Sequence, residues 1–260
     1  MKTTINGIPV YYRDEGHGPL LVLLHGWGSN TDLFDGIYRL ASGKYRVIGP
    51  DFPGAGQSGE PAEPMDLDDY VDFVKRFLAS VAPGEREIIF LGHSHGGRVL
   101  IRMASGMCDD RDRFSISKMI LVDSAGIVPE KTGEQNRKTA RYKRYKAILT
   151  KSGIAKLFPG TLDALQRRFG SADYAAASPV MRQTMVRVVN TDLTEEMPDV
   201  RMPVLLIWGD ADTATPINDG KRMEKLMPEA GLAVIPGAGH FSFLDNPNHF
   251  NRILASFLGI

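Results

Sequence analysis

The chain has 260 residues, 43% of them hydrophobic and 24% charged, which suits one large globular domain with a sizeable core. Lys and Arg number 31 and Asp and Glu number 31, so the formal net charge is zero, which disfavours nucleic acid or an anionic membrane as a partner. The single cysteine, Cys108, excludes an internal disulfide and is compatible with a reducing cytoplasm. We expect it to be a small residue of a helix.

The sequence has no segment of targeting or membrane-spanning character. The residues after Met1 contain no apolar stretch of the signal-peptide type. No apolar run approaches the roughly 18 residues that a membrane-spanning helix needs. We therefore expect a cytoplasmic protein without a membrane span. The sequence carries no signal for the oligomeric state.

Strands and helices alternate in the first half of the chain. Residues 20–24 are apolar throughout, which is typical of a strand buried on both faces of a sheet. Residues 66–81 carry apolar side chains at the 3.6-residue spacing of an amphipathic helix. Asn6-Gly7 predicts a hairpin turn. Further strands are expected at 3–5, 9–13, 45–49, 87–91 and 118–122, and further helices at 31–42 and 95–106. This order favours a parallel sheet with helices on both faces and a site at the carboxyl ends of its strands.

The alternation stops between residues 126 and 200, where no strand pattern is present. Helices are expected at 134–151, 161–169 and 179–190. The segment carries 13 Lys or Arg against 8 Asp or Glu, a net charge of +5. We interpret it as a helical cap. One interpretation is that the basic side of its first helix is simply exposed to solvent. The other is that the segment is a lid that favours anionic substrates or an anionic surface.

The sheet is expected to resume after this segment, with strands at 203–208 and 232–235. A helix is predicted over 217–227 between them. The last helix begins at Asn246-Pro247, with proline at its favoured first position.

Gly92-His93-Ser94-His95-Gly96 joins a predicted strand to a predicted helix. A serine at such a sharp turn has strained backbone angles, so the residues two positions before and after it must be very small. Gly92 and Gly96 meet that requirement, and Gly97 lets the helix press against the sheet. The turn would lift the hydroxyl of Ser94 above the sheet, beside the N-terminal amides of the new helix.

The chain resembles a cap-bearing α/β-hydrolase over nearly its whole length. The resemblance is carried by His25-Gly26-Trp27-Gly28, Asp51-Phe52-Pro53-Gly54-Ala55-Gly56-Gln57-Ser58, Gly92 to Gly97, Trp208-Gly209-Asp210-Ala211-Asp212 and Gly237-Ala238-Gly239-His240. It implies an α/β fold with a mostly parallel eight-stranded sheet, helices on both faces and an inserted helical cap. The corresponding domains are 1–125 (core), 126–200 (cap) and 201–260 (core).

A serine nucleophile needs a base, and a base needs an acid that orients it. His240 lies late in the chain on a loop at the carboxyl edge of the sheet, and the order serine, acid, histidine is the one this fold uses. The resemblance places the acid at Asp212. Asp123, after the preceding strand, is the alternative, and Asp210 is interpreted as a turn residue bonded to its own loop.

The remaining candidates concern the oxyanion and the other histidines. The backbone N–H groups of Trp27 and His95 are the expected oxyanion hole. His93 and His95 are too close to Ser94 in the chain to act as its base, and His25 is expected to brace a loop. His17 and His249 are expected at the surface. The sequence shows no spacing typical of a metal site or a phosphate-binding loop, so no metal or cofactor is predicted, and residues 51–58 are interpreted as a structural turn.

We predict hydrolysis of a small carboxylic ester through an acyl-serine intermediate. The alternative within the fold is hydrolysis of a C–C, amide, lactone or thioester bond. C–C hydrolases of this kind usually have a small residue where His93 stands, so the sequence departs from them there. A ligand-binding receptor on a hydrolase fold is the third hypothesis. The expected partner is a small ester-like molecule, not nucleic acid.

Overall fold

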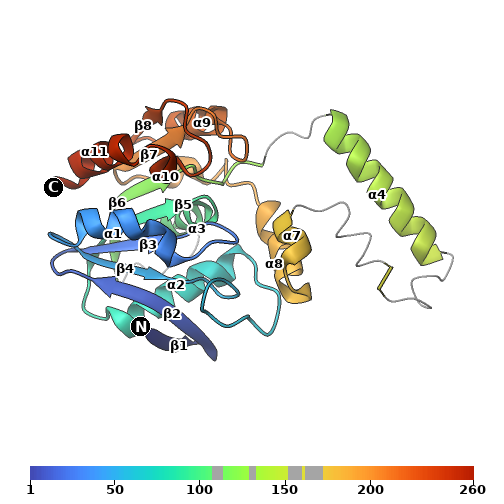
Figure 1. Cartoon of the computed structure of the whole chain (residues 1–260), viewed down its shortest axis with the longest axis horizontal. Coiled ribbons are helices and arrows are strands. Elements are labelled where there is room, and N and C mark those ends of the chain that lie inside the picture. The colour runs from blue at the N-terminus through green and yellow to red at the C-terminus, as the bar shows by residue number, and fades with distance from the viewer. Residues whose placement is uncertain (107–113, 129–132, 152–159, 162–171) are drawn as a thin grey trace.

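A single eight-stranded sheet organises the chain, as the computed structural model shows for residues 1–106, 114–128, 133–151, 160–161 and 172–260 (Figure 1). The strands are β1 (Lys2–Ile5), β2 (Ile8–Glu15), β3 (Leu20–Leu24), β4 (Arg46–Pro50), β5 (Glu87–His93), β6 (Ser115–Val122), β7 (Val204–Gly209) and β8 (Ala230–Ile235). Their spatial order is β1-β2-β4-β3-β5-β6-β7-β8. Pairing is antiparallel between β1 and β2 and between β2 and β4, and parallel from β4 to β8. The predicted fold class is confirmed.

Helices lie on both faces of the sheet. They are α1 (Asp35–Ala41), α2 (Leu67–Val81), α3 (His95–Ala104), α4 (Gly133–Lys151), α7 (Ala172–Ala176), α8 (Pro179–Val189), α9 (Ile217–Leu226), α10 (Ser242–Asp245) and α11 (Pro247–Leu258), with short 3₁₀ helices η1 (Thr31–Phe34) and η2 (Met197–Asp199). One apolar core joins the sheet to α2, α3 and α9, and a second joins its other face to α1, α10 and α11.

The apolar run at β3 explains why both faces are covered. Leu20, Val22 and Leu24 belong to the first core, whereas Leu21 and Leu23 belong to the second. All five side chains are fully buried. Because side chains alternate between the faces of a strand, a run without polar residues requires a helical layer on each side.

The expected elements match the structure with small shifts in their ends. The helix expected at 31–42 divides into η1 and α1, and the strands at β6 and β8 begin earlier than predicted. The short helices α7 and α10 were not predicted, because four or five residues are too few to show a period. Cys108, and the helix expected at 161–169 from residue 162 on, lie outside the described residues.

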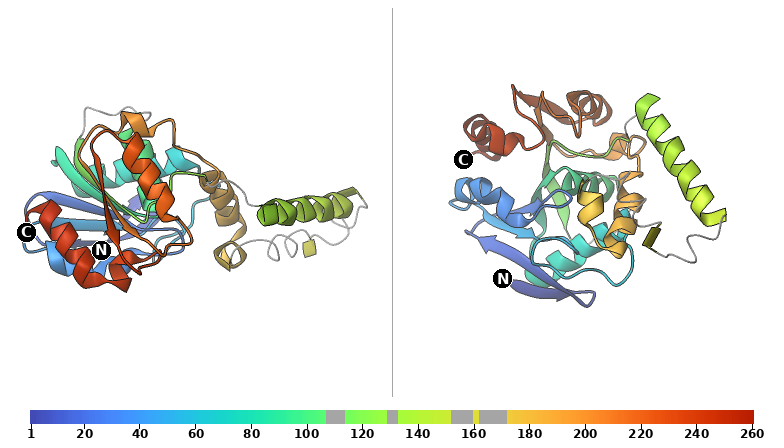
Figure 2. Two further views of the ribbon diagram at one scale, coloured as in Figure 1. Left: turned by 90° about the horizontal axis from the view of Figure 1, so that it is seen from above. Right: turned by 45° about the vertical axis from the view of Figure 1, so that its right-hand side comes forward.

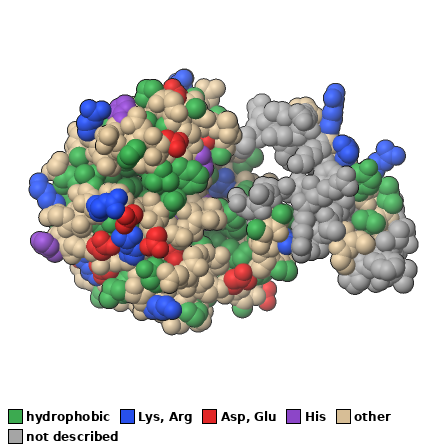
Figure 3. All heavy atoms as spheres, viewed as in Figure 1, with side chains coloured by type: hydrophobic (Ala, Val, Ile, Leu, Met, Phe, Trp, Pro, Cys, Tyr) green, Lys and Arg blue, Asp and Glu red, His purple; other side chains and the backbone are tan. Residues whose placement is uncertain are grey.

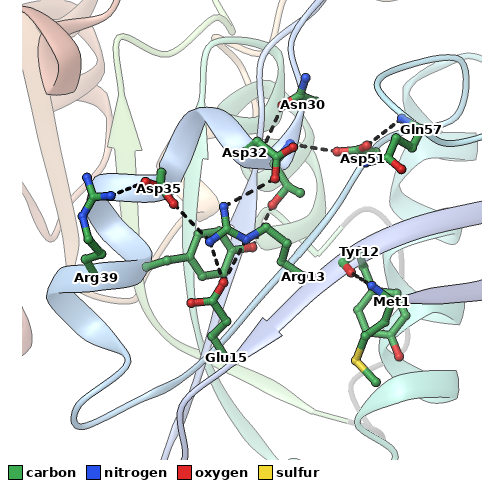
Figure 4. A network of polar contacts seen from close by, with 12 residues as sticks. Met1, Tyr12, Arg13, Glu15, Asn30, Asp32, Asp35, Arg39, Asp51 and Gln57 are labelled. Atoms are coloured by element: carbon green, nitrogen blue, oxygen red, sulfur yellow. Dashed lines mark hydrogen bonds and ion pairs between the residues drawn. The ribbon is translucent and has the colours of Figure 1, made fainter.

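Charged side chains join β2 to the first helical segment (Figure 4). Arg13 pairs with Glu15 on its own strand and with Asp32 and Asp35 at the start of the first helical segment. The carboxylate of Asp51, buried nearby, accepts hydrogen bonds from the backbone N–H groups of Thr31 and Gln57, both at 2.8 Å. The loops after β3 and β4 are therefore tied together beside the carboxyl ends of the strands.

The helices inserted between β6 and β7 lie beside the body of the sheet domain (Figure 1). Figure 2 shows α4 projecting beyond α7 and α8 on the side away from the sheet. Hydrogen bonds hold helix α8 against the body. The hydroxyl of Thr184 accepts a hydrogen bond from the N–H of Met65 at 3.0 Å, and the buried guanidinium of Arg98 on α3 donates to the carbonyl of Val188.

The insertion is closed at its base by two hydrogen bonds. The N–H of Leu193 donates to the carbonyl of Gly126 at 2.8 Å, and the carboxylate of Asp192 accepts from the N–H of Val128 at 2.9 Å. The chain therefore leaves the sheet domain and returns to it at one point.

Candidate active site

The carboxyl ends of the parallel strands gather the residues singled out in the sequence. Ser94 follows β5, Asp123 follows β6, Asp212 comes after β7, and His240 comes after β8. The loop of residues 25–28 follows β3. Because neighbouring parallel strands end at the same edge of the sheet, segments far apart in the chain meet here.

Ser94 occupies a strained turn between β5 and α3. Its φ is 52° and its ψ is −113°, a backbone conformation that residues other than glycine rarely adopt. A Cβ atom on Gly92 would lie 2.6 Å from the backbone of Gly96, and one on Gly96 would lie 2.0 Å from the carbonyl of Leu24. A Cβ on Gly97 would lie 2.0 Å from the hydroxyl of Ser124. The glycines of the motif are therefore required by contact with neighbouring backbone and side chains, as the sequence predicted.

Three side chains form a continuous chain of hydrogen bonds. Nε2 of His240 lies 3.0 Å from Oγ of Ser94, and Nδ1 of His240 lies 2.8 Å from Oδ2 of Asp212. The carboxylate can only accept, so it fixes the proton of the neutral imidazole on Nδ1 and leaves Nε2 free to accept from the serine hydroxyl. A serine arranged in this way can transfer its proton to the imidazole as it attacks a carbonyl carbon.

Both oxygens of the Asp212 carboxylate accept hydrogen bonds. Its Oδ1 accepts from the N–H groups of Ala214 and Thr215 at 2.7 and 3.0 Å, and its Oδ2 lies 2.7 Å from the Thr215 hydroxyl. Burial by itself raises the pKa of Asp212, but the hydrogen bonds from His240 and Thr215 outweigh it and lower the pKa. The group is thus ionised when the imidazole needs a counter-charge.

Asp123 and Asp210 hold the loops around this chain instead of joining it. The buried carboxylate of Asp123 accepts from the N–H of Gly209 at 2.8 Å and from the N–H and hydroxyl of Ser242 at 3.0 and 2.6 Å. Burial raises its pKa to about 6 against the effect of those bonds. Asp210 was expected to bond its own loop, and this was wrong: it accepts from the N–H of Gly237 at 2.7 Å, on the loop that leads to His240.

The oxyanion hole expected from the N–H groups of Trp27 and His95 stays a prediction, and the structure describes the segments that carry them. The first N–H groups of a helix have no acceptor within that helix, and His95 is the first residue of α3. The loop that carries Trp27 is braced by His25, whose Nε2 accepts from the N–H of Phe52 at 2.9 Å and whose Nδ1 donates to the carbonyl of Gly26 at 2.7 Å. His25 thus has the bracing contacts expected of it.

A cavity of about 290 Å³ is lined in part by Trp27 and His95. Its described lining comes from the loop after β3, the loop after β4, α2, α3 and the segment around α7 and α8: His25, Gly26, Trp27, Gly28, Phe52, Pro53, Gly54, Ala55, Glu60, Tyr70, His95, Ala176, Ala177, Ser178 and Met181. The loop at 51–58 is therefore one wall of the cavity. A Cβ on Gly54 would lie 2.4 Å from the sulfur of Met181, so this loop and α8 pack in direct contact.

Residues 21–250 match the sequence model of the alpha/beta hydrolase family. The chain belongs to the alpha/beta hydrolase family.

Similar proteins support this assignment. The chain is 27% identical to a pimeloyl-[acyl-carrier protein] methyl ester esterase of Nitrosomonas europaea, over 93% of this chain and 96% of the relative. It is 24% identical to a 2-(acetamidomethylene)succinate hydrolase of Mesorhizobium japonicum, over 99% and 94% of the two chains. The fold is shared with an enol-lactonase from Burkholderia xenovorans LB400, with a TM-score of 0.74 at 21% identity over the whole of both chains.

Two further features of this hydrolase bear on ions and membranes. Among the described residues, no group of three or more His, Cys, Asp or Glu side chains could hold a metal ion. No helix in the described part of the chain is long and apolar enough to cross a membrane.

The basic character of α4 is visible at the surface of the hydrolase. Arg137, Arg141, Lys143 and Arg144 are exposed, and Figure 3 shows Lys and Arg side chains along α4. No residue of α4 lines the described part of the cavity. A preference of the insertion for anionic partners therefore stays a prediction about its outer surface.

His93 has a contact in the hydrolase that the sequence did not suggest. It is not the base, but its Nε2 donates to the backbone carbonyl of His240 at 2.8 Å, and its ring packs against Phe241 and Phe243. Burial, with the nearby imidazole of His240, lowers the pKa of His93 to about 3. A neutral, fully buried imidazole therefore holds the backbone of His240 in place.

The variant His93→Phe is expected to lower kcat by up to about 100-fold with little change in KM. The phenyl ring keeps the aromatic contacts but leaves the carbonyl of His240 without its donor, so the imidazole loses its fixed distance from Ser94. Stopped-flow or steady-state kinetics with a p-nitrophenyl ester would measure the effect. His93→Gln, which keeps a donor, should stay within about tenfold of the native kcat; a native kcat in His93→Phe would contradict this role.

His95 has no hydrogen-bond partner for its Nε2 within the described chain, although the residue is only 6% exposed. Its ring lies against Trp27, Phe52 and Tyr70, with centroid distances of 5.7, 5.5 and 4.7 Å. Burial, together with the charge of Arg98, lowers the pKa of His95 to about 3. A buried polar atom without a partner is uncommon in folded proteins and calls for a physical reason.

We expect the hydrolase to lose stability as the pH falls below 6.5, and His95→Phe to lose it less steeply. The ordinary pKa of histidine is 6.5, so between that pH and about 3 the unfolded chain binds a proton at His95 that the folded chain does not. This residue therefore contributes a slope of up to about 1.4 kcal/mol per pH unit to the free energy of unfolding. Urea unfolding at several pH values between 7.5 and 5 measures it. Equal slopes in the two proteins would contradict the pKa assignment.

Proposed function

We propose that this chain is a serine hydrolase that cleaves small carboxylic esters through an acyl-serine intermediate. The observation that carries the proposal is the hydrogen-bonded chain from Ser94 through His240 to Asp212, at 3.0 and 2.8 Å. The strained turn that presents Ser94 supports it, because backbone strain is retained where it positions a reacting group.

In the proposed reaction, Ser94 attacks the ester carbonyl while Nε2 of His240 takes the hydroxyl proton. The carbonyl oxygen becomes an oxyanion, which the N–H groups of Trp27 and His95 stabilise. His240 gives the proton to the departing alcohol oxygen, and the carbon–oxygen bond breaks to leave the acyl-serine. Water then loses a proton to His240, attacks the acyl carbon and releases the acid, and the proton returns to Ser94.

The insertion takes the role of a cap in this proposal, with boundaries at residues 126 and 200. Ala176, Ala177, Ser178 and Met181 from this segment line the cavity beside the oxyanion-hole candidates. The shape of the insertion then decides which acyl groups fit over Ser94.

A second candidate function is favoured by the relatives themselves. One solved structure of the same fold is an enol-lactonase, and another is a meta-cleavage product hydrolase with a TM-score of 0.72 at 21% identity. Lactone or C–C bond hydrolysis would use the same residues. A vinylogous diketone acid, followed by the loss of its visible absorbance, and a lactone panel would separate these activities from ester cleavage.

Fluorophosphonate labelling tests the proposal directly. We expect one equivalent of the reagent to add to the native protein and peptide mass spectrometry to place it on Ser94. Acetyl and butanoyl p-nitrophenyl esters should be hydrolysed, with a burst where deacylation is slow. A chain that neither reacts with the reagent nor hydrolyses any ester would be a ligand-binding protein on a hydrolase fold.

A further inference from the structure

Thr215 contacts both oxygens of the Asp212 carboxylate. Its backbone N–H donates to Oδ1 at 3.0 Å, and its hydroxyl donates to Oδ2 at 2.7 Å. Oδ2 is also the oxygen that faces Nδ1 of His240, at 2.8 Å. The side chain of Asp212 is 0% exposed, and a buried carboxylate is costly unless hydrogen bonds replace its water. The contacts of Thr215 therefore stabilise the charge of Asp212 and fix the plane of its carboxylate.

The groups around the Thr215 hydroxyl decide where its proton points. Its Oγ1 lies 2.7 Å from Oδ2 of Asp212 and 3.0 Å from the carbonyl oxygen of Asp123. Nδ1 of His240 lies 3.3 Å from the same Oγ1. The hydroxyl has one proton, and a hydrogen bond to an ionised carboxylate is shorter and stronger than one to a neutral carbonyl. The proton therefore points to Asp212, and the lone pairs of Oγ1 remain available to Nδ1.

This direction of the hydroxyl bears on the tautomer of His240. Two acceptors, Oδ2 of Asp212 and Oγ1 of Thr215, face Nδ1, so a neutral imidazole is favoured with its proton on that nitrogen. With the proton on Nε2, Nδ1 would face oxygen lone pairs unless the hydroxyl gave up its bond to the carboxylate. That tautomer could not take the proton of Ser94, so the hydroxyl favours the reactive one.

The position of this hydroxyl is itself fixed by the chain around it. The buried indole of Trp208 on β7 donates from Nε1 to the carbonyl of Thr215 at 2.7 Å. Pro216 follows Thr215, which disfavours helical backbone angles at the threonine. Threonine is branched at Cβ, and this branch restricts its rotation about χ1. Thr215 is therefore anchored to the sheet, and its hydroxyl has a defined place beside Asp212.

We propose that Thr215 is a positioning residue of the reaction, whose hydroxyl orients the carboxylate of Asp212 and keeps the proton of neutral His240 on Nδ1. The inference rests on the proposed function and deepens it. Valine has nearly the shape of threonine, so packing alone would be satisfied by valine at this position. The hydroxyl is the part of the side chain that contacts Asp212 and His240, and it is the part that the test removes.

Loss of the hydroxyl has a consequence for the pH dependence of the reaction. Burial raises the pKa of Asp212, and the hydrogen bonds from His240 and Thr215 outweigh it and lower that pKa. Without the hydroxyl, Oδ2 stabilises a proton on the pair of Asp212 and His240 more strongly, because one competing donor is gone. The pair then takes up a proton at a higher pH, and activity is lost earlier as the pH falls.

The other titratable groups near the pair are the same in every variant. The buried ring of His93 lies 4.9 Å from that of His240 between centroids. The carboxylates of Asp123 and Asp219 interact with that of Asp212 through their charge. A difference between pH profiles of Thr215 variants therefore reports on the hydroxyl.

Thr215→Val is expected to lower kcat for p-nitrophenyl acetate by about tenfold or more, with KM within about threefold of native. The acid limb of its pH–rate profile should move up by about 0.3–1 pH unit, which corresponds to the loss of one hydrogen bond. Thr215→Ser keeps the hydroxyl and should recover most of both changes. Initial rates between about pH 5 and 9, followed at the isosbestic wavelength of p-nitrophenol, measure these quantities.

Two further variants complete the set. Thr31→Val removes another buried threonine hydroxyl, which bonds the hydroxyl of Tyr38 at 2.7 Å, and should leave kcat and the acid limb at their native values. Thr215→Ala also lacks the hydroxyl, and the same changes are expected of it, so it carries the test if Thr215→Val does not fold.

A native kcat and a native acid limb in the variants that lack the Thr215 hydroxyl would overturn the inference. A lower kcat that leaves the acid limb in place, or that Thr215→Ser does not recover, would also overturn it, because such a result describes lost packing. Hydrolysis that depends on Ser94 is measured separately in the native protein. If it is absent, the proposed function fails; if it is present while the Thr215 variants behave as native, only this inference fails.

Discussion

Ser94→Ala is expected to lower the turnover of a p-nitrophenyl ester by about 10⁶-fold if Ser94, His240 and Asp212 act as one unit. Without Oγ there is no atom to form the acyl intermediate, and His240 has no proton to take. The residual rate would come from the oxyanion hole acting on attack by water, which retains a measurable fraction of catalysis. Initial rates at high enzyme concentration, together with loss of fluorophosphonate labelling, would measure the change.

Ser105→Ala provides the matched control for this variant. Ser105 follows the last residue of α3, the helix that begins next to Ser94, and its hydroxyl bonds to the carbonyl of Arg102. Removal of this hydroxyl should leave turnover close to native. Turnover within tenfold of native in Ser94→Ala would mean that another residue carries the reaction.

Asp212→Asn is expected to lower kcat by about 10⁴-fold while the protein stays folded. The amide presents an N–H₂ group as well as an oxygen, so it no longer requires the imidazole proton to stay on Nδ1. It also lacks the negative charge that stabilises the imidazolium formed when Ser94 loses its proton. A pH–rate profile would show a lower plateau without recovery at high pH.

Asp123→Asn distinguishes the two acids that the sequence left open. Its carboxylate accepts three hydrogen bonds from Gly209 and Ser242, so an amide leaves buried N–H groups facing one another. We expect a loss of about 1–3 kcal/mol in the free energy of unfolding, with a smaller loss of kcat than in Asp212→Asn. The reverse order of kcat values would transfer the role of the acid to Asp123.

The fold was predictable because each core strand carries its own signal. The apolar run at 20–24 predicts a strand that is covered on both faces. The glycines around Ser94 indicate a turn that has no room for a Cβ atom. Both signals are local, since they depend on residues adjacent in the chain. The short helices α7 and α10 have no such signal, because their positions are set by the segments that surround them.

In the candidate site, too, the residues with a local sequence signal were predicted and the contacts between distant segments were not. Ser94 and His240 were predicted from motifs and chain order, and Asp212 from the family resemblance. The structure brings the three side chains within hydrogen-bonding distance. The contact of His93 with the carbonyl of His240 joins residues 147 positions apart and leaves no trace in local spacing. The surroundings of His95 likewise come from three separate segments, so its unpartnered nitrogen could be recognised only in three dimensions.

The closure of the insertion between Gly126 and Leu193 has a consequence for how such a chain can diverge. A segment whose two ends meet is a module, because residues can be added or removed inside it without shifting the register of β6 against β7. Doubling the length of a flexible loop costs only about 0.6 kcal/mol in closure entropy. Related chains can therefore exchange the inserted segment while they keep the sheet and the residues at its carboxyl edge unchanged.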